Sequence, residues 1–207
     1  MMKNNHLKYA LIENKNIIII TLIIYSIIGI MCNFGDSKDI QVLKTYEMFL
    51  LPFVACWIIY SFWDYVDKNI CEIFLSYPKS RLAISFSKIT YMLVLYIIVY
   101  SILFLISFSE LEMKSIYYFG TIAEIIFWSS VGYYLVICTR NIILSISVIW
   151  IYTATQVLDV EKYFSLIAIY FYPYDTISEI IIKGSILLII SVILILVAQK
   201  KFDNMKL

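Results

Sequence analysis

The sequence has little charge, and this scarcity excludes a soluble protein. Charged residues make up 15% of the 207 positions and hydrophobic residues 62%, whereas soluble domains carry about 25% charged and about 45–50% apolar residues. The chain is too short for two ordinary domains and too apolar to be one water-soluble core, so the excess of apolar residues must face lipid. The net charge of +1 gives no overall field that would favour a nucleic-acid partner.

Histidine and glycine are also scarce, and their scarcity excludes the common catalytic and metal-binding motifs. His6 is the only histidine, and the four cysteines (Cys32, Cys56, Cys71 and Cys138) form no C-x-x-C pair, so the ligand spacing of a structural zinc site is missing. The five glycines form no phosphate-binding loop, and no H-E-x-x-H or G-x-S-x-G motif occurs. We therefore expect no catalytic residue, no metal and no cofactor bound by this chain, and inert packing for the cysteines.

Long apolar stretches predict an all-α integral membrane protein with six transmembrane helices. A helix needs roughly 20 residues to cross about 30 Å of hydrocarbon. The predicted spans cover residues 17–32, 47–63, 89–108, 116–158 as two helices, and 184–198. The stretch 116–158 would be about 65 Å long as one helix, so we expect a hairpin with Arg140 at its tight turn.

Two apolar stretches have a second interpretation. Residues 17–32 follow a basic leader and so resemble a signal peptide, but no small-x-small cleavage site follows them, which favours a retained first helix. Residues 163–172 could be read as a seventh crossing, but they are too few to span the bilayer and precede Pro173, and a seventh crossing would put Lys200, Lys201 and Lys206 outside. We interpret them as a re-entrant or interfacial segment on the outer side.

The distribution of basic residues predicts that both termini are cytoplasmic. With six spans and the N-terminus inside, the cytoplasmic segments hold eleven Lys and Arg against five acidic residues, and the outer segments hold five against nine. An excess of Lys and Arg on the cytoplasmic side is the usual determinant of orientation. The predicted location is the cell (plasma) membrane, with lipids as direct partners.

Glu124 is the carboxylate that the sequence places within the membrane, about eight residues into the fourth span. Buried charges in membranes usually face the bundle interior or water. Glu124 is therefore a candidate pathway residue for a substrate or a proton. In the alternative interpretation, it lies near the outer headgroups, hydrogen-bonded to a neighbouring helix or still wetted.

The inner loop 64–88, between the second and third spans, is amphipathic as well as polar. Its apolar residues recur at helical spacing and are Ile70, Ile73, Phe74 and Tyr77. Pro78 ends this short helix, and Ser80 can cap the helix that leads into the third span. Such a loop either docks a cytoplasmic partner or anchors itself at the membrane surface.

The same loop carries a motif, E-x-x-L-S-x-P-x-S-R, whose fixed positions are Glu72, Leu75, Ser76, Pro78, Ser80 and Arg81, followed by Lys88. With the basic leader, the six predicted spans and the tight turn between the fourth and fifth, the chain resembles ABC-2-type transporter permeases. It departs from them in having Asn69-Ile70-Cys71 where a glycine often precedes the glutamate.

The resemblance implies a single permease domain over residues 1–207 that works as half of an exporter. A second permease subunit, identical or paralogous, and two separate ATP-binding subunits, which hold the ATP and Mg, would complete it. The resemblance also implies an interfacial leader at 1–16 and an extracellular lid at 159–183. The implied ATPase-coupling residues are Ile70, Glu72, Ile73, Phe74, Leu75, Ser76, Tyr77, Pro78, Lys79, Ser80 and Arg81.

The expected function is export of a hydrophobic or amphipathic cargo, such as a peptide, lipid or drug-like molecule. The small versions of these permeases are often linked to export of, or immunity to, antimicrobial peptides. The main alternative is a stand-alone channel or secondary transporter, which should show internal repeats. An embedded enzyme is a further alternative.

Overall fold

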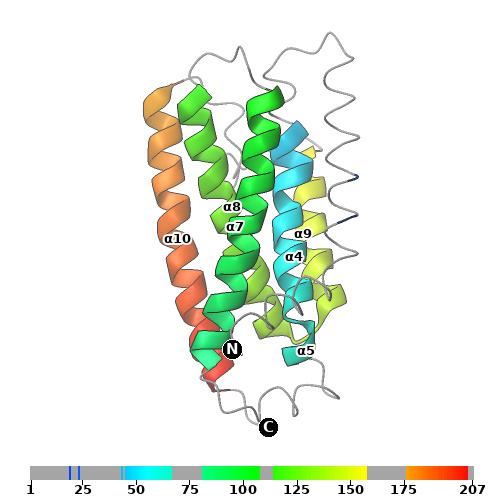
Figure 1. Ribbon diagram of the computed structural model, residues 1–207. Helices are drawn as coiled ribbons and strands as arrows, with labels where there is room; N and C mark the ends of the chain where they lie inside the picture. Colours follow the sequence, from blue (N-terminus) through cyan, green and yellow to red (C-terminus); the bar gives the residue numbers. More distant parts are fainter. Residues whose placement is uncertain are drawn as a thin grey trace, which may run out of the picture.

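The computed structural model describes Ile19, Ile23, Leu43 and residues 45–66, 81–107, 114–157 and 176–204, and all regular structure in these ranges is helical (Figure 1). The elements are η1 (Tyr46–Leu50), α4 (Leu51–Ser61), α5 (Trp63–Val66), α7 (Arg81–Ser107), α8 (Lys114–Thr139), α9 (Ile142–Val157) and α10 (Ile177–Asp203). The predicted all-α class is confirmed for these residues.

Three of these helices are long and apolar enough to cross a membrane. They are α7 over Leu82–Ile106, α8 over Ser115–Thr139 and α10 over Ile177–Asp203, and two shorter apolar helices cover Tyr46–Ser61 and Ile142–Thr155. The chain is therefore a helical membrane protein. The predicted first span lies outside the described residues except for Ile19 and Ile23, which are helical, and the segment 163–172 lies outside them entirely.

Two helices begin earlier than their predicted spans. α7 begins at Arg81 instead of residue 89, and α10 covers Ile177–Asp203 instead of 184–198. An apolar span read from the sequence stops at the first charged residue, here Lys88 or Lys183. The backbone hydrogen bonds of a helix continue past such residues, since no proline interrupts them there.

The second predicted span, 47–63, is divided into three helical pieces. Pro52 occupies the start of α4, and the preceding turn η1 is a π-helix, in which the Leu51 N–H donates to the Tyr46 carbonyl oxygen. Proline has no N–H to continue the α-helical ladder, and π-turns occur where that ladder is locally disturbed. At the other end, Phe62 leaves helical geometry before the short α5.

The predicted hairpin with Arg140 at its turn is confirmed. α8 ends at Thr139, Arg140 has φ of 51°, and α9 begins at Ile142. Asn141 caps α9, because its Oδ1 accepts a hydrogen bond from the Leu144 N–H at 3.1 Å. The Thr139 and Ser145 hydroxyl groups, 2.8 Å apart, join the two helices across the turn.

The helix α8 is the centre of the bundle and packs against both α10 and α4. Within its apolar stretch, 61% of the residues of α8 are buried, compared with 28% for the apolar stretch of α7 and 22% for that of α10. Exposed apolar side chains on the outer helices, such as Phe86 and Ile102 on α7 and Ile182 and Leu196 on α10, are those expected to face lipid.

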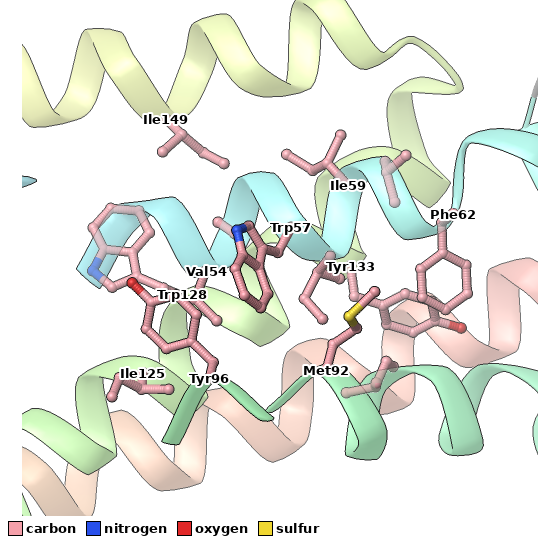
Figure 2. Close-up of a cluster of buried hydrophobic side chains, with 14 of the residues drawn as sticks. Val54, Trp57, Ile59, Phe62, Met92, Tyr96, Ile125, Trp128, Tyr133 and Ile149 are labelled. Carbon is pink, nitrogen blue, oxygen red and sulfur yellow. The ribbon is translucent and has the colours of Figure 1, made fainter. Parts of the chain in front are cut away.

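Aromatic side chains fill the space between α4, α7, α8 and α9 (Figure 2). Trp57 and Tyr96 meet edge to face at 5.2 Å between ring centroids, and Phe62 lies 4.8 Å from Tyr133. Close approach of α8 to α4 depends on Gly132, since a Cβ there would lie 2.6 Å from the Ala55 carbonyl oxygen. These contacts fix the rotation of α8 and hence the direction in which its polar residues point.

Candidate functional site

The most unusual polar group of the described bundle is the Glu124 carboxylate. Glu124 is the eleventh of the 26 residues of α8, which places it about 15 Å along the helix axis from the first residue. The side chain is 0% exposed, and neither carboxylate oxygen has a hydrogen-bond partner among the residues that the structure describes. The structure therefore shows neither a hydrogen bond to a neighbouring helix nor contact with solvent, the two features of the alternative interpretation.

Two charged side chains from other helices act electrostatically on Glu124. Glu47, on η1, is 0% exposed, and Lys183, on α10, is partly buried; both interact with the Glu124 carboxylate. Beside them, α10 approaches α8 closely, because a Cβ on Gly184 would lie 3.6 Å from the Ala123 Cβ. These three ionisable side chains, which come from three elements, interact electrostatically and form the candidate functional site.

A second polar atom without a partner lies one turn further along α8. The indole Nε1 of Trp128, which is 2% exposed, makes no hydrogen bond within the described part of the chain. Residues four apart lie on the same face of a helix, so Trp128 and Glu124 share a face of α8. The Trp128 ring contacts Tyr152 of α9 at 5.6 Å between centroids. This face combines a hydrogen-bond acceptor and a donor that the described helices leave without a hydrogen bond.

A different polar cluster lies at the end of the bundle that contains the α8–α9 turn, and this one is hydrogen-bonded. The Gln199 Oε1 of α10 accepts from the Tyr133 hydroxyl of α8 at 3.0 Å and also from the Ser85 hydroxyl of α7. The Gln199 Nε2 donates to Asp203 Oδ1 at 2.8 Å. One amide therefore connects three helices.

Two lysines extend this cluster toward the ends of α4 and α8. The Lys88 ammonium donates to the Ser61 carbonyl oxygen at 2.6 Å and lies 4.6 Å from the centre of the Tyr65 ring. The Lys201 ammonium donates to the Cys138 carbonyl oxygen at 3.3 Å. Cations suit the carbonyl groups left open at helix C-termini, so this end of the bundle is basic.

The predicted coupling residues are not brought together by the described structure. Residues 70–80, which include all of them except Arg81, lie outside the described residues. Arg81 is the first residue of α7. The residues between α5 and α7 nevertheless connect two helix ends at the basic end of the bundle, where Ser61 and Lys88 meet.

Sequence reasoning missed three residues that the structure brings into polar sites. Glu47 and Lys183 were assigned to outer segments or span ends, and Gln199 was counted only as the residue after the last span. The signal for Lys183 was present, since Ile180, Ile181 and Ile182 precede it and make it part of an apolar run. Pairing between Glu47 and Glu124 depends on helix rotation, which a single sequence does not reveal.

Among residues 45–66, 81–107, 114–157 and 176–204, no group of three or more His, Cys, Asp or Glu side chains is placed to hold a metal ion. Comparisons of the chain with protein-family models, with curated proteins and with solved structures give no match.

Proposed function

We propose that this protein is the transmembrane permease subunit of an ATP-driven exporter of the ABC-2 type, crossing the membrane six times with both termini in the cytoplasm. The observation that carries the proposal is the position of the loop motif. It joins α5 to α7 at the end of the bundle where Lys88, Arg140, Lys200 and Lys201 also lie. An excess of basic residues marks the cytoplasmic side, where an ATPase would bind.

The proposed mechanism transmits ATPase closure to the bundle through the loop. Residues 70–81 would seat in the ATP-binding subunit, and the directly attached α7 would move with them. α7 is joined to α10 and α8 by the hydrogen bonds of Gln199 with Ser85 and Tyr133, so motion of α7 would pass to the central helix. A rigid-body shift of packed helices of this kind is a common form of switching.

The proposed cargo is hydrophobic or amphipathic. Only six residues separate α7 from α8, and eighteen residues lie between α9 and Thr176, so these connections contain no large hydrophilic domain. A second permease subunit, identical or paralogous, would complete the pathway. The ATP would bind to the partner subunit, which would supply the energy for transport.

Association with an ATP-binding subunit tests the proposal directly. We expect the tagged chain, solubilised from its native membrane in mild detergent, to co-purify with a P-loop ATPase that mass spectrometry identifies. A variant carrying both Glu72→Arg and Arg81→Glu should still insert but should lose most of this subunit, since the charges of the docking loop are reversed. Absence of an ATPase from the wild-type preparation would contradict the proposed function.

The buried Glu124 favours a second candidate, a secondary transporter driven by an ion gradient. Intramembrane carboxylates frequently form part of proton or ion relays. Transport into vesicles separates the two candidates. A requirement for ATP and the partner subunit supports the exporter, and uptake driven by a pH or sodium gradient alone supports the secondary transporter.

Orientation is tested with exposed residues at the two ends of the bundle. In a background without the native cysteines, Ser178→Cys should react with a membrane-impermeant thiol reagent added to intact cells. Asn141→Cys, at the exposed turn after Arg140, should react only after the membrane is permeabilised. The reverse pattern would place the basic end outside and overturn the proposed topology.

A further inference from the structure

The turn between α8 and α9 presents an exposed cation. Arg140 is exposed, and its guanidinium group makes no hydrogen bond or ion pair with the residues that the structure describes. Its φ of 51° lies in the left-handed region, where a helix usually ends on glycine or asparagine because other side chains are disfavoured there. The turn thus holds a long charged side chain at a position where the backbone alone would favour a small residue.

The last turn of α10 brings a second cation to the same place. The Lys201 ammonium group donates to the carbonyl oxygen of Cys138 at 3.3 Å, and Cys138 lies two residues before Arg140. The Cα atoms of Cys138 and Arg140 are at most about 7.6 Å apart, so both cationic side chains are long enough to reach one phosphate group. An ammonium group has three donors, and the bond to Cys138 uses one of them.

The adjoining ends of these three helices carry more positive than negative charge. Their cations are Arg140, Lys200 and Lys201. Their one carboxylate, that of Asp203, accepts a hydrogen bond from the Gln199 Nε2 at 2.8 Å. α9 contains no charged residue, and the charged residues of α8 lie within its first eleven positions. Three positive charges and one negative charge give these helix ends a net charge of +2.

Exposed apolar side chains adjoin these cations. Ile143 and Leu144, at the start of α9, are 76% and 50% exposed, and Val197, one turn before Lys201 on the same face of α10, is 48% exposed. The apolar span of α8, Ser115–Thr139, has 25 residues and is about 37 Å long, which exceeds the hydrocarbon core of about 30 Å. The turn after α8 therefore reaches the lipid headgroups, and the apolar side chains beside it reach the acyl chains.

This combination of charge and apolar surface fits a phospholipid better than a soluble anion. Arginine binds phosphate through two parallel N–H···O hydrogen bonds, and lysine adds a compact charge. The cations alone would recognise a soluble anion, whereas a lipid would also contact Ile143 and Leu144. Basic sites between transmembrane helices at headgroup level are suited to anionic headgroups.

We propose that Arg140 and Lys201 bind the phosphate group of an anionic phospholipid, with Lys200 beside it and an acyl chain against Ile143 and Leu144. The site belongs to the bundle itself, so it exists whether or not an ATPase partner does and whichever side of the membrane the turn faces. A bound lipid would join the end of α10 to the α8–α9 turn and stabilise this end of the bundle.

Native mass spectrometry of the full-length protein tests the proposal. The delipidated protein, in mild detergent, is titrated with phosphatidylglycerol or with phosphatidylcholine of the same acyl chains. A basic residue near an anionic lipid surface strengthens binding roughly fivefold, so the two cations should make the first phosphatidylglycerol bind roughly 25-fold more tightly than phosphatidylcholine. Arg140→Gln and Lys201→Gln should each weaken phosphatidylglycerol binding roughly fivefold and leave phosphatidylcholine binding unchanged.

Lys114→Gln is the matched control, because it also removes one positive charge but lies at the other end of α8. It should keep the wild-type affinity for both lipids. The variant that carries both Arg140→Gln and Lys201→Gln should lose the preference for phosphatidylglycerol altogether. Misfolding would weaken the binding of both lipids, so a selective loss of phosphatidylglycerol cannot come from misfolding.

Three results would overturn the proposal. Equal affinity of the wild type for the two lipids would show that no selective site exists. An equal loss of phosphatidylglycerol binding in Lys114→Gln would show that net charge, and not this turn, sets the preference. Glycerol 3-phosphate, a headgroup without acyl chains, should displace phosphatidylglycerol only weakly, and displacement at a similar concentration would identify a site for soluble anions instead.

Discussion

Replacing Gly132 with valine is expected to break the packing of α8 against α4 and to destabilise the whole bundle. A Cβ at this position would lie 2.6 Å from the Ala55 carbonyl oxygen, 2.9 Å from its Cα and 3.1 Å from its carbonyl carbon. All three are backbone atoms of a buried helix and cannot move independently. Overpacking of this kind costs about 3 kcal/mol, and an unfolding titration of the purified protein in mixed micelles measures it.

Gly184 provides the matched control for this prediction. A Cβ there would meet the Phe119 ring at 3.0 Å, and a side-chain ring can shift where a backbone carbonyl cannot. We expect Gly184→Ala to unfold close to the wild type and Gly132→Ala to lie between the wild type and Gly132→Val. Equal stability of Gly132→Val and the wild type would show that α4 and α8 do not approach each other as described.

Replacing Gln199 with leucine is expected to loosen the basic end of the bundle. The substitution removes the acceptor of the Tyr133 and Ser85 hydroxyl groups and the donor to Asp203. Tyr133 is fully buried and would lose its hydrogen bond to α10. Interhelical hydrogen bonds in membranes contribute about 0.6 kcal/mol on average and up to about 1.7 kcal/mol, so we expect a total loss of about 1–2 kcal/mol.

A double-mutant cycle tests whether the hydrogen bond between Tyr133 and Gln199 accounts for this loss of stability. Tyr133→Phe removes the same hydrogen bond from the other side, so its effect should not add to that of Gln199→Leu. Ser185→Ala serves as the control, because its exposed hydroxyl bonds only the Ile181 carbonyl oxygen within α10. Additive losses for Gln199→Leu and Tyr133→Phe, measured by the same unfolding titration, would contradict a shared bond.

The features that depend on local sequence could be predicted, and those that depend on helix rotation could not. The α8–α9 hairpin followed from length, because one helix over 116–158 would greatly exceed the bilayer, and Arg140 lies at its turn as expected. The start of α7 and both ends of α10 were placed too far inward, since charged residues end an apolar stretch without ending a helix. The π-turn η1 has a local cause, the proline that follows it at Pro52, but helix packing determines where along the chain the turn forms.

The residues of the polar sites also differ in whether the sequence alone could identify them. Glu124 was singled out because a carboxylate inside an apolar span is rare, and this needs only the sequence. Its relation to Glu47 and Lys183 needs three elements at a defined rotation, which close contacts such as those of Gly132 with Ala55 and Gly184 with Ala123 determine. Gln199 was overlooked for the same reason, since nothing in its sequence neighbourhood predicts that two hydroxyl groups from other helices meet it.

The central position of α8 has a consequence for how the protein is made. Synthesis proceeds from α4 to α10, so α8 enters the membrane when α4 is already present and α10 does not yet exist. Until then, the side of α8 that carries Ala123, against which Gly184 packs in the finished protein, is open to lipid, with Glu124 next to it. The C-terminal helix therefore completes the shielding of α8, and a nascent chain that stops before residue 176 would leave the Ala123 side of this central helix open to lipid.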